Sequence, residues 1–238
     1  MQPSPCDILR LTVHQVMRTN VDGVVATAQA VAGGMIDKGG GVFVAMGSVS
    51  AAMITPYAGA YCASKAAVTA VCDALRMELA PFNVQVLEVV AGAIRTSFSD
   101  NALKLSNLPD GSRYAKVQSY IHARVTLSQG AGVMPANEFA ATVVDAALAA
   151  KPAARLVAGG HAIKYHLIGR WYPRRLWAKA ISSRLGLSLL QSPDQATAAQ
   201  SLGRVLALVR ALLDAIVSWL IDAAVAVAVR LQAVLRRS

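Results

Sequence analysis

The sequence predicts an α/β fold built on a doubly wound parallel sheet. Three short, continuous apolar runs predict buried parallel strands near residues 42–47, 84–90 and 155–158. Segments long enough to form helices separate these runs, and this alternation is typical of right-handed strand–helix–strand crossovers. A long helical pattern at residues 201–238 predicts an additional element at the C-terminal end of the sequence.

The first strand is expected between two helices. Apolar residues recur at helical spacing over residues 6–32, and Gly33-Gly34 predicts the end of that helix or a turn soon after it. Gly39 to Gly41 predict a turn immediately before the first strand. Residues 60–79 carry a long helical pattern that leads into the second strand.

The segment between the second and third strands is less regular. Residues 97–131 are polar and predict an irregular stretch. A helix is expected to follow over residues 135–150, with Asn137 as its N-cap. We therefore expect residues 1–190 to form one domain, which residues 191–200 link to an amphipathic helix at 201–238.

The composition limits the classes of function. The chain has 238 residues, of which 55% are hydrophobic and 15% charged, which argues against a disordered protein. Its net charge of +10 would suit nucleic acid, an anionic membrane surface or an anionic cofactor. Nucleic acid is the weakest of the three, because no nucleic-acid-binding motif is present.

The cysteines and the N-terminal residues bear on metal binding and location. The spacing of the three cysteines fits neither a zinc site nor a disulfide framework, so we expect no metal and a reducing compartment. Residues 1–10 do not form a signal peptide. We expect a cytoplasmic protein, with association at a membrane surface as a further option.

The expected C-terminal helix is the reason for considering association at a membrane surface. Arg210, Asp214, Asp222 and Arg230 interrupt its apolar run, so it is too short to span a bilayer and is expected to be amphipathic. Its apolar face needs a partner. An anionic membrane surface and a second copy of the chain, in a homodimer, both remain open.

Three residues carry the candidate chemistry. Ser48 follows the first strand, and Tyr61 and Lys65 lie four positions apart on one face of the next helix. A lysine ammonium near a phenol favours the phenolate, which would make Tyr61 an acid/base that works near neutral pH. A serine hydroxyl at the end of the preceding strand would hydrogen-bond a substrate carbonyl oxygen. The set suits proton transfer to or from a carbonyl or alcohol oxygen.

Four ordered features resemble the short-chain dehydrogenase/reductase family. The family's active-site Ser, Tyr and Lys match Ser48, Tyr61 and Lys65, and its additional Asn matches Asn20 in N-V-D-G. Its P-G-x-x-x-T stretch matches residues 91–96, with Ala91 in place of proline. The resemblance covers roughly residues 7–187. The sequences around these motifs, A-Y-C-A-S-K-A-A and D-A-L-R-M-E-L-A-P-F, resemble the branch of retinol, hydroxysteroid and acyl-dihydroxyacetone-phosphate reductases.

The resemblance implies a partial Rossmann-like fold and an oxidoreductase that uses NAD or NADP. It assigns catalysis to Asn20, Ser48, Tyr61 and Lys65. It assigns cofactor contacts to Tyr61, Lys65, Gly92, Ile94 and Thr96. The substrate would be a small hydrophobic alcohol or carbonyl compound, because residues 97–131, which would cover it, include apolar side chains.

The resemblance also implies a missing part. Family members begin with a strand, a T-G-x-x-x-G-I-G loop and a helix whose N-terminus receives the pyrophosphate. Neither Gly33-Gly34 nor Gly39 to Gly41 replaces that loop, because neither leads from a strand into a helix. We expect the first four strands of the sheet to be absent and cofactor binding to be weak. The alternative is a non-catalytic remnant, or a protein that contacts a membrane or a partner.

Overall fold

The computed structural model describes residues 13–104, 106–190, 215, 218 and 219. The chain divides between Gly186 and Leu187 into two units. The second unit contributes a short 3-10 helix, η6 (Leu187–Leu190), to the described residues. The expected linker at 191–200 and nearly all of the expected helix at 201–238 lie outside them, so these two predictions stay predictions.

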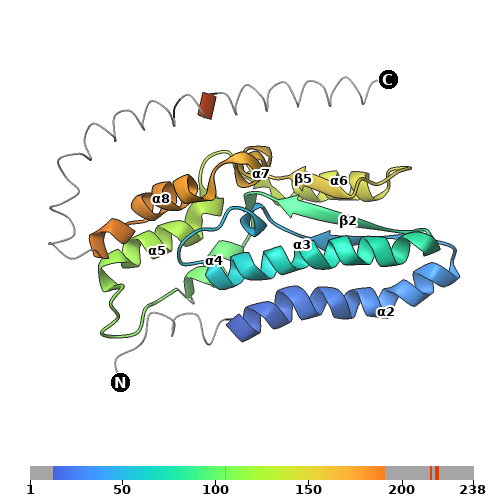
Figure 1. The fold of residues 1–238 in the computed structure, drawn as a ribbon, viewed down its shortest axis with the longest axis horizontal. Coiled ribbons are helices and arrows are strands. Elements are labelled where there is room, and N and C mark those ends of the chain that lie inside the picture. The colour runs from blue at the N-terminus through green and yellow to red at the C-terminus, as the bar shows by residue number, and fades with distance from the viewer. Residues whose placement is uncertain (1–12, 105, 191–214, 216–217, 220–238) are drawn as a thin grey trace. The chain divides into compact units, whose positions relative to one another are not determined.

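The first unit is organised around a parallel sheet (Figure 1). Strands β1 (Gly41–Met46), β2 (Val84–Ala91) and β5 (Arg155–Ala158) pair in the order β1-β2-β5. Both pairings are parallel, with Phe43 opposite Val86 and Val90 opposite Val157. The prediction of an α/β fold with a parallel sheet is confirmed, and each predicted strand lies within one residue of the observed bounds.

Helices cover both faces of this sheet. Along β1, Phe43 and Ala45 pack on one face against α2 (Gly23–Asp37) and α3 (Gly59–Leu79), in a cluster with the buried Val68 and Cys72. Successive strand residues point to opposite faces, so Val42 and Val44 pack on the other face in a second cluster. Phe139 of α6 (Ala136–Ala147) belongs to that second cluster. The sheet is therefore doubly wound.

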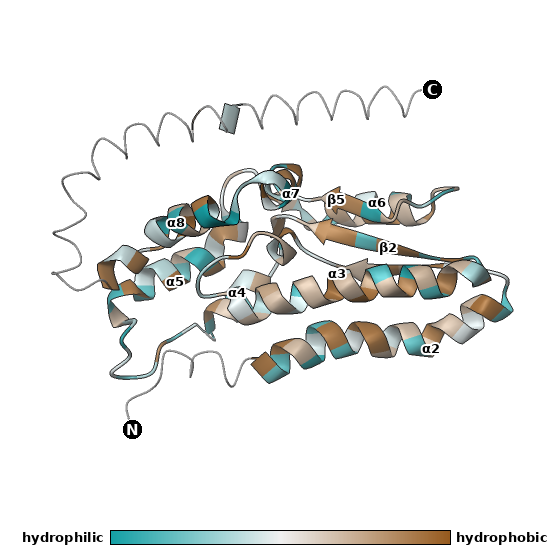
Figure 2. Ribbon diagram, viewed as in Figure 1, coloured by the Kyte–Doolittle hydropathy of each residue, from teal (hydrophilic) through white to brown (hydrophobic). Residues whose placement is uncertain are grey.

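Local sequence explains why α3 is long and where it ends. Its 21 residues contain no proline and no glycine after the first position. Five of them are buried: Cys62, Ser64, Val68, Cys72 and Leu79. Pro81 lies in the short helix η3 (Ala80–Phe82) that follows, and Asn83 in the left-handed conformation turns the chain into β2. In Figure 2 the strands β2 and β5 are largely brown, as expected of buried strands.

Two helix boundaries differ from the prediction. Helix α2 continues through Gly33 and Gly34 to Asp37, because Met35 and Ile36 pack against the core beyond the glycines. Burial of these side chains outweighs the roughly 1 kcal/mol that each helical glycine costs. Asn137 lies inside α6, and Pro135 occupies the N-cap position.

The stretch at 97–131 is largely helical rather than irregular. It contains α4 (Phe98–Lys104), η4 (Ala115–Val117), α5 (Gln118–Val125) and η5 (Thr126–Gln129). Buried Val117 and Ile121 hold it against the rest of the unit. The short strands β3 (Ile94–Arg95) and β4 (Met134–Pro135) pair in parallel at its two ends.

Helices α7 (Ala162–Trp171) and α8 (Arg174–Arg184) complete the first unit, and Pro173 separates them. The π-helix η1 (Arg18–Asp22) precedes α2. Within the described residues, no helix is long and apolar enough to cross a membrane. The same residues hold no group of three or more His, Cys, Asp or Glu side chains that would bind a metal ion.

Candidate active site

Ser48 lies just past the C-terminal end of β1. Its backbone is extended, and its Oγ accepts a 3.1 Å hydrogen bond from the Ser50 amide, so it caps the short helix η2 (Val49–Ala51). The side chain is buried. The Ser48 hydroxyl also lies close enough to the phenol of Tyr61, at the N-terminal end of α3, to lower the pKa of that phenol. The two residues therefore meet at the C-terminal end of the parallel sheet, where open α/β sheets bind their ligands.

Lys65 follows Tyr61 by one helical turn. Its Nζ donates a 2.8 Å hydrogen bond to the Met46 carbonyl at the end of β1. The same Nζ is 5.8 Å from the centroid of the Tyr61 ring. Burial lowers the pKa of Lys65 from its ordinary value. The structure thus brings the three predicted residues together, with the ammonium between the strand end and the phenol.

The charge that acts on Tyr61 differs from the one expected. Burial raises the pKa of Tyr61, while the nearby Ser48 hydroxyl and the positive charge of Arg124 oppose that rise. The sequence predicted that Lys65 lowers this pKa; in the structure the pKa is raised overall, and the cation that opposes the rise is Arg124, on α5.

Asn20 reaches the site through one intermediary. It lies in the π-helix η1, and its Nδ2 donates a 2.9 Å hydrogen bond to Ser64 Oγ. The Ser64 hydroxyl in turn donates to the Tyr61 carbonyl at 2.8 Å. Single π-turns are rare and occur often at functional sites. Asn20 is therefore tied to the backbone of the helical turn that carries Tyr61, rather than to the phenol.

The expected cofactor residues lie where β2 ends. Gly92 follows β2, Ile94 belongs to β3, and Thr96 Oγ1 accepts a 3.3 Å hydrogen bond from the Phe98 amide. Only glycine fits at position 92, because an added Cβ would lie 2.4 Å from the Gly160 carbonyl oxygen. The Phe98 ring lies 5.8 Å from the Tyr61 ring, centroid to centroid. This segment therefore joins the site through Phe98.

Three residues of this neighbourhood were missed from the sequence: Ser64, Phe98 and Arg124. Ser64 lies directly before Lys65, so its place in the motif was the signal available. Phe98 closely follows Thr96. Arg124 had no such signal, because its segment was expected to be irregular.

Comparison with known proteins supports one family. Residues 7–105 match the family described as short chain dehydrogenase. A dehydrogenase/reductase SDR family member 7B from Danio rerio is 40% identical over 101 residues, which cover 42% of this chain and 31% of that protein. An NADPH-dependent 1-acyldihydroxyacetone phosphate reductase from Saccharomyces cerevisiae is 25% identical over 185 residues, 76% of this chain and 60% of that protein.

The chain is similar to members of the short-chain dehydrogenase/reductase family over residues 7–105. A crystal structure of a short-chain dehydrogenase from Streptomyces avermitilis shares its fold, with a TM-score of 0.53 at 24% identity over 70% of this chain and 57% of that one. The chain spans less than two thirds of the length of these relatives. The family resemblance inferred from the sequence motifs is confirmed.

The side chains at the sheet end fit one end of a nicotinamide dinucleotide. Lys65 provides an ammonium near the Tyr61 ring, and Thr96 provides a hydroxyl two residues before Phe98, whose ring contacts Tyr61; these groups would suit the hydroxyl and amide groups of a nicotinamide riboside. Within the described residues, no strand is followed by the T-G-x-x-x-G-I-G loop that receives the pyrophosphate in the family, and the Gly159-Gly160 turn between β5 and α7 does not match that pattern. The fit is therefore limited to the nicotinamide end.

Proposed function

We propose that this chain carries the substrate-side half of an NAD(P)-dependent oxidoreductase that interconverts an alcohol and a carbonyl. The observation that carries the proposal is the meeting of Ser48, Tyr61 and Lys65 at the C-terminal end of the sheet. A nicotinamide cofactor would supply the hydride. Similarity to the family supports this class of reaction, and the fixed arrangement of the three side chains supports these residues as its catalytic groups.

The protein's part in carbonyl reduction is proton delivery. Tyr61 gives its phenolic proton to the substrate oxygen, and Ser48 donates a hydrogen bond to the same oxygen. The Arg124 guanidinium stabilises the phenolate that remains, and the Lys65 ammonium lies 5.8 Å from the centroid of its ring. Asn20 fixes, through Ser64, the backbone turn from which the phenol projects. Alcohol oxidation runs the same proton transfer in reverse.

A hydrophobic substrate is proposed because apolar side chains remain uncovered near the site. Phe98, whose ring lies tilted against that of Tyr61, is 58% exposed, and Leu127 in the neighbouring η5 is 52% exposed. An apolar substrate would cover such side chains. NADPH is the first cofactor to test, because the yeast relative is named for it. Peripheral membrane contact and a homodimer depend on residues 201–238 and remain predictions.

The proposal is tested by cofactor binding and turnover. The chain alone should bind NADPH weakly in calorimetry, because its sequence does not contain the T-G-x-x-x-G-I-G loop that receives the pyrophosphate in the family. A fusion that places the yeast relative's preceding segment before residue 7 should bind NADPH and oxidise it with a hydrophobic ketone. A fusion that binds NADPH and reduces none of a panel of ketones and aldehydes would favour the alternative, a protein without catalytic activity.

A further inference from the structure

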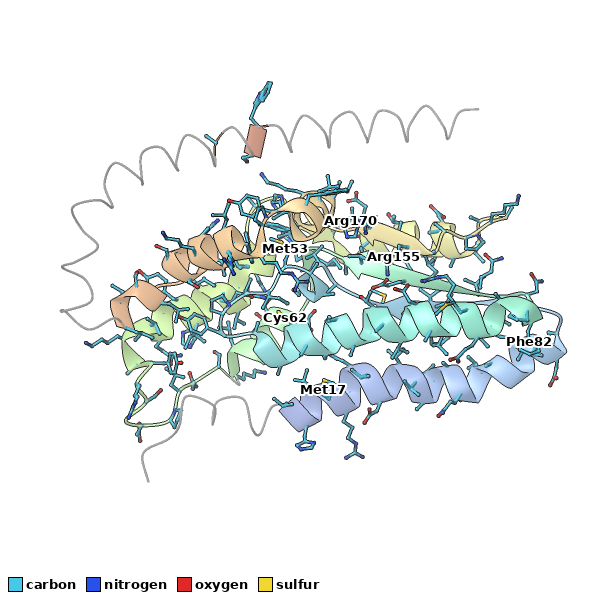
Figure 3. The ribbon with its side chains drawn as sticks, viewed as in Figure 1. Met17, Met53, Cys62, Phe82, Arg155 and Arg170 are labelled. Carbon is cyan, nitrogen blue, oxygen red and sulfur yellow. The ribbon has the colours of Figure 1, made fainter. Side chains whose placement is uncertain are left out.

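Arg124, on α5, has a half-buried side chain whose charge acts on the Tyr61 phenol. Its Nε donates a 2.6 Å hydrogen bond to Thr55 Oγ1. Thr55 is itself buried, in the segment that connects η2 to α3. That segment runs between Met53 and Cys62, both labelled in Figure 3. Arg124 is therefore anchored six residues before Tyr61, and its charge acts on that phenol.

The anchoring segment is held firmly from the other side. Trp177 Nε1 donates to the Ile54 carbonyl at 2.7 Å, and the Tyr57 hydroxyl donates to the Leu185 carbonyl at 2.8 Å. Helix α5 is fixed in turn by the buried Ile121. The guanidinium is thus held between two packed elements rather than on a mobile surface side chain.

Arg124 has no acidic partner in the part of the chain that the structure describes. In the ion pairs found there, Arg76 pairs with Asp73, and Arg155 pairs with both Asp73 and Glu88. None of these pairs includes Arg124. Burial lowers the pKa of Arg124, as expected for a cation without a compensating charge. Burying a charge without a counter-charge is costly, so an anion that binds there would gain free energy.

The remaining N–H groups of Arg124 are open to a ligand. A guanidinium has five N–H donors, and Thr55 uses the one on Nε. The described residues contain no buried side-chain nitrogen or oxygen without a hydrogen-bond partner, so the Nη groups are not sealed inside the protein. Two Nη groups in one plane match the two oxygens of a carboxylate or a phosphate.

We infer that the substrate of this site carries an anionic group, a carboxylate or a phosphate, which Arg124 binds while the reacting carbonyl lies at Tyr61 and Ser48. The inference rests on the proposed function and narrows its substrate class. The substrate is then an amphipathic molecule, with an apolar part against Phe98 and Leu127 and an anionic part at Arg124.

The test compares three probes of equal chain length on the full chain by titration calorimetry: octanoate, octyl phosphate and 1-octanol. The anions should bind roughly 10- to 100-fold more tightly than octanol, the range expected for a hydrogen-bonded charge pair. The tighter of the two anions identifies the group as a carboxylate or a phosphate. Octanol binding as tightly as both anions, or no measurable binding of either anion, overturns the inference.

Variants assign the preference to Arg124. Arg124→Met removes the charge and keeps the length, so it should abolish the preference for anions and leave octanol binding unchanged. Arg175→Met, on the exposed surface of α8, is the matched control and should keep the preference. Arg124→Lys retains the positive charge and should keep most of the preference for anions. Circular dichroism shows whether Arg124→Met folds. If it does not, the test rests on the Arg124→Lys variant and on the comparison of the anions with octanol in the wild-type chain.

The outcome is independent of catalysis, because these titrations need neither cofactor nor turnover. A fusion that binds NADPH without reducing any carbonyl, while the chain still prefers anions through Arg124, would overturn the proposed function alone. An active fusion whose chain shows no dependence on Arg124 would overturn the anionic substrate alone.

Discussion

Asn20 Nδ2, in η1, donates a 2.9 Å hydrogen bond to Ser64 Oγ, in α3. Ser64 is fully buried and passes the connection to the Tyr61 carbonyl. The bond links the π-turn of η1 to the first turns of α3. It defines the geometry of the candidate site without contacting the reacting atoms.

Ser64→Ala should therefore destabilise the protein. The substitution leaves the Asn20 amide without its partner, which costs about 1–3 kcal/mol of unfolding free energy. Urea denaturation followed by circular dichroism measures the loss. Ser119→Ala, at an exposed position on α5, is the control and should change stability by less than about 0.5 kcal/mol. An equal effect of the two substitutions would show that the hydrogen bond contributes nothing.

Glu88 predicts a second stability effect. Its carboxylate is buried in β2, where it accepts hydrogen bonds from Arg155 at 2.6 Å and from Thr69 at 2.5 Å. Arg155, labelled in Figure 3, also pairs with Asp73. Arg155→Met leaves Glu88 buried without its cation and should cost about 2–4 kcal/mol, allowing for the partial exposure of Arg155.

The double substitution Arg155→Met with Glu88→Leu is the informative control. It removes both charges, so it should be more stable than Arg155→Met alone. Guanidinium denaturation of the three proteins measures the difference. A double variant less stable than the single one would mean that Glu88 needs no counter-charge.

Two glycines of contrasting environment give a third prediction. Gly92→Ala should destabilise by roughly 1–3 kcal/mol, because its Cβ would overlap the Gly160 backbone. Gly33→Ala, inside α2 with nothing within 4 Å of the added Cβ, should stabilise by about 0.5–1 kcal/mol. The midpoint temperatures of thermal unfolding of the two variants should shift in opposite directions from that of the wild type. A shift in the same direction would contradict the observed backbone packing.

His166 predicts a pH dependence. It lines a cavity of about 260 Å³ together with Arg155 and Arg170. Burial and these two arginines lower its pKa from 6.5. The unfolded chain therefore binds a proton more readily than the folded one, so stability rises with pH from the lowered pKa up to about 6.5. Below the lowered pKa, both states are protonated and the full penalty is present.

His166→Gln should flatten that dependence. Urea midpoints measured from pH 5 to pH 7.5 should rise less steeply in the variant than in the wild type. His14→Gln, on an exposed position, should keep the wild-type slope. Proton NMR titration of the imidazole checks the same point directly. A His166 resonance that titrates above 6.5 would contradict the electrostatics described here.

The sequence predicted the sheet well because buried parallel strands are short, apolar and bounded by turns. Five of the seven residues at 84–90 are valine or leucine, and β2 was found there. The end of α2 was predicted less well, because the glycine signal is local whereas Met35 and Ile36 pack against distant residues. The helices within 97–131 were missed for the same reason: contacts made by Val117 and Ile121 hold a segment of weak periodicity.

The site was predictable where its residues form a motif. Ser48, Tyr61 and Lys65 have fixed spacing, and the structure brings them together. Arg124 was not predictable, because it reaches the site from 63 positions beyond Tyr61 in sequence and no pattern marks it. The electrostatics of a phenol depend on every charge around it, so they required coordinates.

The role of Tyr61 is tested most directly by Tyr61→Phe in the NADPH-binding fusion. The variant keeps the ring that contacts Phe98 and removes only the hydroxyl that would give the proton. We expect kcat/KM for ketone reduction to fall about 100- to 10,000-fold, the usual contribution of a positioned general acid, while NADPH binding measured by calorimetry stays unchanged. A Phe variant that reduces the ketone as fast as its parent would contradict the assignment of Tyr61 as the acid/base.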